Sequence, residues 1–216
     1  MSNDLNFYIN GEWVKSESNE TIDVINPANE EVIGQVTAGN KEDIDKAVSA
    51  ALDAFSSYQQ TTKTQRIELL KNVITEYEAR YDDFVQTISK EMGSPIWLSE
   101  AAQAKTGIKN IQETLDALES YEFERPEGDY TLIKEPIGVI GMITPWNWPM
   151  NQITTKVSAA LAAGCTMVLK PSEISPYCAM LLAEVFDKAG VPNGVFNVVN
   201  GYGPTVGAAL SEHPDV

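Results

Sequence analysis

The chain has 216 residues, 43% of them hydrophobic, and its 31 acidic against 15 basic side chains give a formal net charge of −16. This composition is typical of a globular protein and argues against a disordered acidic tail. The charge argues against nucleic acid or an anionic membrane surface as partner, because both attract clustered Lys and Arg. Residues 1–136 carry −14 of the total.

The amino-terminal Met1-Ser2-Asn3-Asp4 contains neither a basic nor an apolar stretch, and the chain has two cysteines, Cys165 and Cys178. We therefore expect no secretion and no disulfide scaffold, and a cytoplasmic location. Residues 137–155 are uncharged over a length that could span a membrane. Their prolines and amides would be poorly tolerated in a spanning helix, so we expect no membrane partner.

The first forty residues predict short strands. Residues 7–14 place Asn10-Gly11 between two β-prone pairs, which indicates a hairpin. Further strands are expected over residues 21–25 and 31–36, separated by a turn that begins at Asn26-Pro27.

Amphipathic helices follow, with the acidic excess on their outer faces. Asn40 is expected to cap the first helix, and Asp43 suits its positive end. The expected apolar face of this helix consists of Ile44, Val48, Leu52 and Phe55. Hydrophobic faces are also expected in the second helix (Ile67, Leu70, Ile74 and Tyr77) and in the third (Phe84, Ile88 and Met92), which ends before Gly93-Ser94-Pro95.

A fourth helix is expected over residues 96–121. Residues 122–128 are charged and contain Pro126 and Gly128, so we interpret them as a boundary or an exposed connection. A strand at residues 130–134 then ends at Pro136.

From residue 137 the pattern changes to apolar runs that alternate with helices. The runs cover residues 139–143, 166–169 and 195–199, and helices are expected at 150–163, from Ser175 to Gly190, and after Pro204. This alternation predicts βαβ units on a parallel sheet, and the lack of charge fits strands that are covered on both faces. The fold class is α/β: a Rossmann-like parallel sheet with helices on both faces, preceded by β-hairpins and amphipathic helices.

Ligands of such sheets bind beyond the carboxyl ends of the strands. The segments 144–149, 170–173 and 200–204 lie there and offer an aromatic wall, an amide, a cation, a carboxylate and glycines. The first loop lacks G-x-G-x-x-G, so the ordinary nicotinamide fingerprint is absent. Topology alone leaves open whether the ligand is a nucleotide.

The same loops carry a resemblance to a known family. Residues 145–149 (PWNWP), 160–166 (ALAAGCT), 168–173 (VLKPSE), 190–197 (GVPNGVFN) and 201–207 (GYGPTVG) occur in this order and spacing. Together they resemble the NAD-dependent aldehyde dehydrogenase superfamily, and residues 7–13 and 25–28 resemble the opening of that family. The resemblance covers essentially the whole chain.

The resemblance implies that an aldehyde is oxidised with NAD as the hydride acceptor. In the family a cysteine thiolate attacks the aldehyde, and Asn147 matches the asparagine whose side-chain N–H stabilises the resulting oxyanion. The alternative for Asn147 is a helix-capping or turn residue before Pro149. Trp146 matches a residue that lines the cofactor channel, and its alternative is core packing.

Lys170 and Glu173 resemble the pair that binds the adenosine ribose, and Glu173 would repel a 2′-phosphate and so favour NAD over NADP. The alternative is a solvated lysine and a glutamate in the first turn of a helix. Gly203, Pro204 and Gly207 resemble the helix start that packs against adenine, where a side chain would block close approach. The remaining expected cofactor-binding residues are Ile143, Thr144, Pro145 and Ser172.

Neither cysteine is expected to be the nucleophile. Cys165 precedes its strand, at the edge of the sheet away from the expected crevice, and Cys178 lies on an apolar helical face. His213 is the only histidine, which leaves no Ser-His-Asp or Cys-His site and no Cys/His cluster for zinc. We expect no metal site.

The expected organisation has three parts: residues 1–121 are the strands and helices that begin the cofactor-binding domain, 122–136 a connection and an oligomerisation-arm strand, and 137–216 a truncated Rossmann-like half. The resemblance implies that the nucleophilic cysteine, the general-base glutamate and the pyrophosphate-binding turn lie after Val216. We therefore expect an incomplete fold: an amino-terminal fragment without dehydrogenase activity of its own.

Two alternatives remain: a non-catalytic nucleotide-binding or assembly module, and a remnant unable to fold because sheet edges are exposed. The resemblance implies a small aldehyde as substrate and a homo-oligomer, dimer or tetramer, for the full-length protein. The sequence does not identify the aldehyde, although Trp148, Met150 and Gln152 are candidates to contact it.

Overall fold

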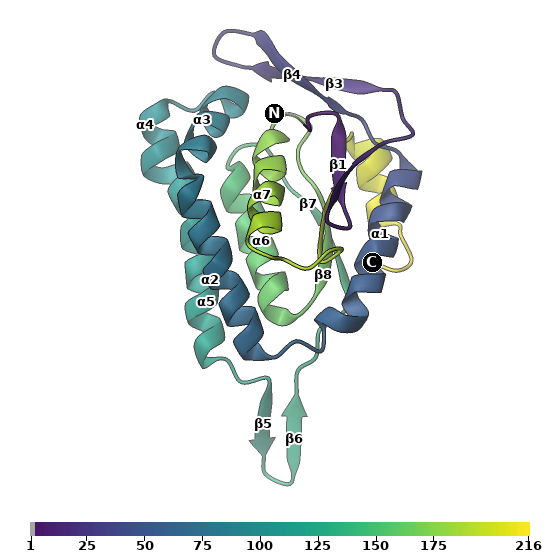
Figure 1. Ribbon diagram of the computed structural model, residues 1–216, viewed down its shortest axis with the longest axis vertical. Coiled ribbons are helices and arrows are strands. Elements are labelled where there is room, and N and C mark those ends of the chain that lie inside the picture. The colour runs from purple at the N-terminus through teal and green to yellow at the C-terminus, as the bar shows by residue number, and fades with distance from the viewer. Residues whose placement is uncertain (1–2) are drawn as a thin grey trace.

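A five-stranded sheet with the strand order β2-β1-β9-β8-β7 forms the centre of the computed structural model, which describes residues 3–216 (Figure 1). The strands are β1 (Asn6–Ile9), β2 (Glu12–Lys15), β7 (Val139–Ile143), β8 (Thr166–Lys170) and β9 (Phe196–Val198). The pairs β7–β8 and β8–β9 are parallel, so the predicted α/β fold with a parallel sheet is confirmed. Met1 and Ser2 of the amino-terminal segment lie outside the described residues.

The predicted hairpin at the amino terminus is present and joins this sheet. Asn10 and Gly11 adopt φ values of 55° and 77°, the left-handed pair that a two-residue hairpin turn requires. Strand β1 pairs antiparallel with β9, Tyr8 being opposite Val198. The backbone N–H of Asn10 also donates to Oδ1 of Asn197 at 3.0 Å. The hairpin is thereby hydrogen bonded to a residue 187 positions further along the chain.

Helices cover both faces of the sheet, as predicted. The crossover helices α6 (Pro149–Ala163) and α7 (Tyr177–Lys188) pack together and against α2 (Lys63–Ala79). The helix α1 (Lys41–Tyr58) contacts the other face together with the π-helical turn η2 (Gly203–Gly207) and α8 (Ala208–Ser211). The side chains of β8 alternate accordingly. Met167 and Leu169 join the core beneath α6 and α7, and Val168 joins the core beneath α1.

Helix α1 shows why an apolar residue can lie outside the core. Asn40 caps the helix as predicted, in a capping box with Asp43. The prediction that Leu52 belongs to the apolar face is wrong, because Leu52 is 40% exposed. The buried stripe passes through Ala47 and Ala51 instead, and one residue further along is a rotation of about 100°.

The third helix ends where it was predicted to end. Helix α3 (Tyr81–Met92) ends at Gly93, whose φ of 73° is the left-handed conformation of a helix carboxyl cap. The fourth predicted helix is one helical run in three parts: α4 (Ile96–Leu98), the π-helical η1 (Ser99–Ala104) and α5 (Lys105–Ser120). Strands β3 (Thr21–Asn26) and β4 (Glu31–Thr37) form a separate two-stranded sheet.

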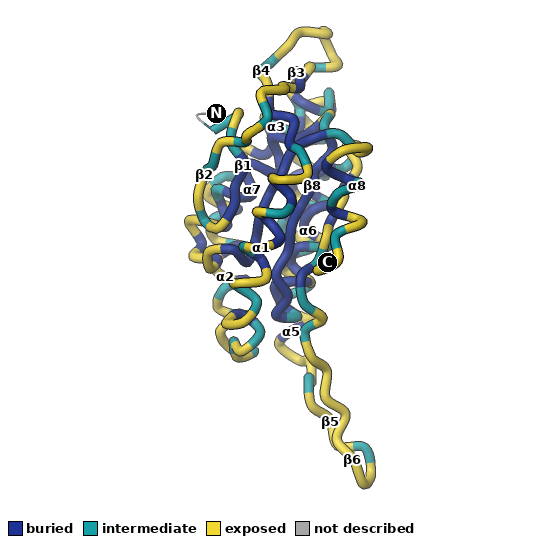
Figure 2. The backbone as a smooth tube through the Cα atoms, turned by 90° about the vertical axis from the view of Figure 1, so that its right-hand side faces the viewer, coloured by how far each residue is buried: buried dark blue, intermediate teal, exposed yellow. Residues whose placement is uncertain are grey.

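A two-stranded arm projects from the end of the molecule at which α5 ends (Figures 1 and 2). It consists of β5 (Glu124–Glu127) and β6 (Tyr130–Ile133), paired antiparallel across Gly128-Asp129. Most of residues 122–128 are exposed, as expected of a boundary or an exposed connection, but the strand β5 within them was not predicted. The sequence did not predict this strand because it contains Pro126, and proline is disfavoured in strands. A proline is tolerated in a ribbon with free edges, where a missing N–H breaks no ladder.

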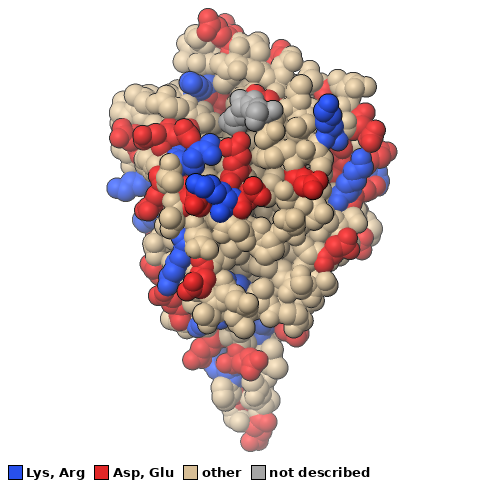
Figure 3. Space-filling model, in the orientation of Figure 1, with Lys and Arg blue, Asp and Glu red and all other residues tan. Residues whose placement is uncertain are grey.

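The surface is acidic without a separate basic area on the face shown in Figure 3, where Lys and Arg are scattered among Asp and Glu. Within residues 3–216, no helix is long and apolar enough to cross a membrane. The same residues contain no cluster of three or more His, Cys, Asp or Glu able to hold a metal ion.

Candidate functional site at the carboxyl edge of the parallel sheet

Lys170, the last residue of β8, is a buried cation with two partners. Its Nζ donates to a carboxylate oxygen of Glu173 at 2.8 Å and to the carbonyl oxygen of Pro171 at 3.0 Å. Burial opposes ionisation of Glu173, but the hydrogen bonds from Lys170 and from a backbone N–H outweigh it and hold the pKa of Glu173 below its ordinary value. Glu173 is therefore ionised at neutral pH.

The alternative for this pair, a solvated lysine beside a first-turn glutamate, is wrong. The Lys170 side chain is only 3% exposed, and α7 begins at Tyr177, after Glu173. A buried ammonium needs a charged partner, and the loop provides one within three residues.

The loop after β7 lies beside this pair. Thr144 is buried, and its backbone N–H donates to the carbonyl oxygen of Lys170 at 3.2 Å. Ile143 is 47% exposed, and the following Pro145 is exposed as well. Trp146 is also 47% exposed, which excludes the alternative that it packs in the core.

Asn147 lies exposed in the same loop. The alternative that it caps α6 is wrong, because Trp148 occupies the cap position and no side chain makes a cap hydrogen bond there. Among residues 3–216, no described contact joins Asn147 to Lys170 or Glu173. Thr144 is thus hydrogen bonded to Lys170, whereas Asn147 lies in the same loop as Thr144 without a described contact to the ion pair.

Gly207, in the turn after β9, lies next to Ile143 and Lys170 at the carboxyl edge of the sheet. A Cβ atom added to Gly207 would lie 3.7 Å from Cδ1 of Ile143 and 3.9 Å from Cδ of Lys170. These are ordinary contacts, so the protein itself has room for a side chain at this position. Gly203 faces open space, with no atom within 4 Å of an added Cβ, and Pro204 is exposed. The residues that line this edge therefore leave a space that glycine keeps open.

Two buried polar atoms at this edge have no hydrogen-bond partner among the described residues: Oγ of Ser175 and Oδ1 of Asn200. Both lie in loops that follow parallel strands, where ligands of such sheets bind. Asn200 lies in the segment 200–204 that the sequence predicts at this edge, but it was not among the predicted site residues. Its position as a polar residue directly after a buried strand is the sequence signal that could have identified it. An incomplete set of hydrogen bonds here fits the presence of a polar ligand.

Ser172 has a local role in this structure. It is buried, and its Oγ accepts the backbone N–H of Ile174 at 3.3 Å. This bond shapes the loop that carries Glu173.

Both cysteines are buried, and Cys165 lies at the end of β8 opposite the carboxyl edge. Cys165 is 2% exposed and precedes β8, and Cys178 is fully buried in the first turn of α7. Burial, with the nearby Glu91 carboxylate, raises the pKa of the Cys178 thiol well above its ordinary value. Neither thiol has the exposure that a nucleophile requires.

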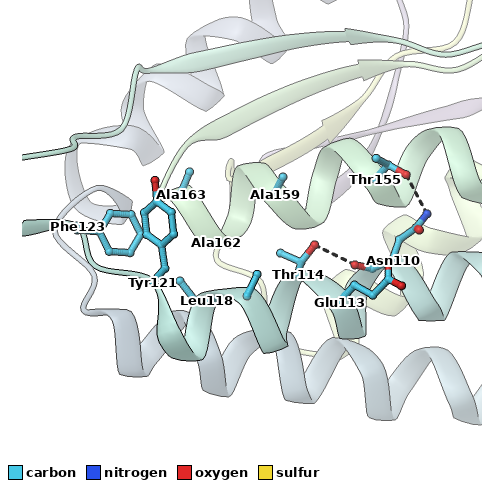
Figure 4. A pocket seen from close by; sticks show the side chains of 11 residues that line it. Asn110, Glu113, Thr114, Leu118, Tyr121, Phe123, Thr155, Ala159, Ala162 and Ala163 are labelled. Atoms are coloured by element: carbon cyan, nitrogen blue, oxygen red, sulfur yellow. Dashed lines mark hydrogen bonds between the residues drawn. The ribbon is translucent and has the colours of Figure 1, made fainter.

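A cavity of about 450 Å³ lies elsewhere, between α5 and α6 (Figure 4). Asn110, Thr114 and Thr155 form its polar end, and Tyr121 and Phe123 its aromatic end. None of the predicted site residues lines it.

The parallel sheet, its two crossover helices and the polar groups at its carboxyl edge define a protein of the Rossmann-like α/β class. The chain belongs more narrowly to the aldehyde dehydrogenase family, whose sequence model matches residues 13–216. A protein of Staphylococcus aureus (strain USA300) that carries the name of an aldehyde dehydrogenase is 56% identical over 209 residues, which are 97% of this chain and 44% of that protein.

Solved structures show the same relationship. The C291A mutant of aldehyde dehydrogenase C from Pseudomonas syringae, in complex with NAD+ and octanal, is 44% identical and superposes with a TM-score of 0.98 over the whole chain and 44% of its own length. The NAD+ complex of an aldehyde dehydrogenase from Bacillus cereus is 34% identical, with a TM-score of 0.93 over 99% of this chain and 45% of its own. The chain thus spans less than half the length of these relatives.

Proposed function

We propose that this chain is the NAD-binding amino-terminal part of an oxidoreductase that converts an aldehyde into a carboxylic acid. Membership of the aldehyde dehydrogenase family supports this, as do the relatives solved with NAD+, one of them also with octanal. The observation that supports the proposal best is the ion pair of the buried Lys170 with the partly exposed Glu173, beside Gly207. When bound, NAD would supply the hydride acceptor.

The Lys170–Glu173 pair would bind the adenosine ribose. The ammonium would donate its remaining N–H to a ribose hydroxyl, and the partly exposed carboxylate would accept a hydrogen bond from the 2′-hydroxyl. A 2′-phosphate would meet the negative charge of Glu173, so the pair favours NAD over NADP. Because Lys170 is already fixed by Pro171 and Glu173, little side-chain entropy would be lost on binding.

The other residues at the carboxyl edge would form the walls of the nucleotide site. Gly203, Pro204 and Gly207 would leave room for the adenine, and the β7 loop would line the channel toward the nicotinamide. The wall residues of that loop are Ile143, Thr144, Pro145 and Trp146. Ser172 would contribute through the loop shape that its hydrogen bond to Ile174 maintains.

Asn147 would donate its side-chain N–H to the oxyanion that forms when a nucleophile adds to the aldehyde. An amide suits this role, because it donates a hydrogen bond and does not titrate. The exposure of Asn147 and its lack of a capping bond in α6 leave its amide available.

We propose that the 216-residue chain alone has no dehydrogenase activity, because Cys165 and Cys178 are buried and no other thiol is present. The alternative function, a non-catalytic nucleotide-binding or assembly module, is favoured by this same observation. The longer protein would act as a homodimer or homotetramer, to which the exposed arm β5–β6 would contribute.

Calorimetric titration of the 216-residue chain with NAD, ADP-ribose and NADP tests the nucleotide site. We expect binding of NAD and ADP-ribose and weaker binding of NADP. If none of the three nucleotides binds, the chain does not contain a preformed nucleotide site. An assay with octanal and NAD then separates the two functions. Activity that appears only when the rest of the family fold is attached supports the enzyme, and binding without activity in the longer protein supports the module.

A further inference from the structure

Glu91 is a fully buried carboxylate on α3 with both oxygens aimed at another helix. Its Oε2 accepts the backbone N–H of Tyr177 at 2.7 Å, and its Oε1 accepts that of Cys178 at 3.0 Å. These are the first two residues of α7. Glu91 thus closes the amino terminus of α7 from a helix 86 residues earlier in the chain.

Helix α7 has no cap of its own. Pro176 occupies the cap position, and no side chain near it in sequence makes a cap hydrogen bond. The first N–H groups of a helix otherwise lack partners, and a negative charge at this end is favourable. Glu91 therefore provides what the local sequence of α7 lacks.

The segment whose end Glu91 holds is the loop of residues 171–176, which joins β8 to α7 and carries Glu173. Its other end is fixed by Lys170 in the parallel sheet. We propose that Glu91 is a positioning residue of the nucleotide site, which fixes this loop at α7 so that Glu173 stays beside Lys170. This inference rests on the proposed nucleotide-binding function.

The carboxylate is costly to bury, which makes its charge state sensitive to pH. Burial raises the pKa of Glu91 to about 7, although the hydrogen bonds from Cys178 and Tyr177 oppose the rise. The titratable groups that face it are the thiol of Cys178 and the hydroxyl of Tyr177, with Tyr77 and Asp4 adjacent to these two. Burial raises the pKa of all three, thiol and both tyrosines, away from neutrality.

The first experiment compares Glu91→Gln with Tyr58→Phe by calorimetry with NAD at pH 8. Glutamine keeps the size of the side chain but offers one acceptor instead of two. Tyr58→Phe removes a different buried hydrogen bond, the 3.0 Å bond to the carbonyl oxygen of Leu161, far from the loop. We expect only Glu91→Gln to weaken NAD binding, by about tenfold. Equal NAD affinity in both variants would overturn the proposal.

The second experiment is independent of nucleotide. Hydrogen-exchange protection factors of the Tyr177 and Cys178 amides are measured in the unmodified chain from pH 6 to pH 8.5. A protonated carboxyl is a poorer acceptor, so we expect the protection of these two amides to fall selectively below pH 7. Unchanged protection would overturn the positioning role even if NAD binds. Selective loss without any NAD binding would uphold the contact and refute the proposed function instead.

Discussion

The ammonium of Lys170 lies 2.8 Å from the carboxylate of Glu173, three residues further along, and only the carboxylate is partly exposed. The pair therefore presents a negative group to the ligand and keeps the positive one behind it. Replacing Glu173 by serine should remove the negative charge, so that the nearest charge to the ligand is the positive one of Lys170. We expect Glu173→Ser to reduce the preference for NAD over NADP by about tenfold, because Lys170 then faces a 2′-phosphate without an opposing charge.

Calorimetric affinities for NAD and NADP check this expectation, with the exposed Glu68→Ser on α2 as a control for the loss of one charge. A preference that remains as strong in Glu173→Ser as in Glu68→Ser would contradict the ribose role.

Gly207 offers a change with opposite effects on stability and binding. Its φ is −64°, and an added methyl group would make only ordinary contacts. We expect Gly207→Ala to raise the free energy of unfolding by about 0.5–1 kcal/mol, because alanine is the better helix former. The same methyl group should weaken NAD binding by occupying the space kept for the ligand. Denaturant titration and calorimetry measure the two effects, and unchanged NAD affinity would argue that this space has no ligand.

Burial of Glu91 predicts a pH dependence of global stability. Its pKa is raised to about 7 in the folded state, so the folded protein holds a proton that the unfolded chain releases at lower pH. Stability from this group is therefore greatest below about pH 4.5 and is lost as the pH rises to about 7, by about 3 kcal/mol.

The measurement is the difference in unfolding free energy between the unmodified chain and Glu91→Gln, from pH 5 to pH 8. We expect the glutamine variant to gain relative stability as the pH rises. A difference that does not vary with pH would show that Glu91 does not titrate in this interval. This trend is opposite in sign to the expected protection of the α7 amides, so the two effects are separable.

Asn147 can be tested in the longer protein that carries the rest of the family fold. We expect Asn147→Ala to lower kcat by about 10²–10³-fold, the usual cost of removing one oxyanion donor, with little change in NAD affinity. Asn147→Asp should be no better, since a carboxylate would repel the oxyanion. If NAD affinity falls in both variants by as much as kcat does, Asn147 belongs to the cofactor site instead.

The arm β5–β6 predicts a surface that a second copy covers. In strand β6, Tyr130 is 67% and Ile133 is 57% exposed. We expect Ile133→Asp to shift the longer protein toward the monomer in analytical ultracentrifugation without lowering the Tm of the isolated chain. An unchanged assembly would exclude Ile133 from the interface.

The fold was predictable where a local signal was strong. The Asn10-Gly11 turn, the Asn40 cap and the carboxyl-cap glycines each specify their conformation within a few residues. Strand β5 was missed because Pro126 opposes it locally, and only the pairing with β6 stabilises it. The exposure of Leu52 likewise depends on which side of α1 meets the sheet, which periodicity alone does not fix.

The candidate site was predictable to the level of its loops. The rule that ligands bind at the carboxyl edge selected the segment 170–173, and the family resemblance selected Lys170 and Glu173 within it. The structure joins the two side chains by a hydrogen bond. The contribution of Glu91 was not predictable, because it acts across 86 residues of sequence and carries no local motif. The unpartnered atoms of Ser175 and Asn200 required coordinates for the same reason.

The pairing of β1 with β9 has a consequence for biosynthesis. Tyr8 and Val198 occupy adjacent strands, so the ladder between β1 and β9 can close only after residue 198 has been synthesised. Contacts this distant in sequence slow folding, since a long loop must be ordered first. Until residue 198 has emerged, the nascent hairpin has an unpaired edge, which can pair with other chains.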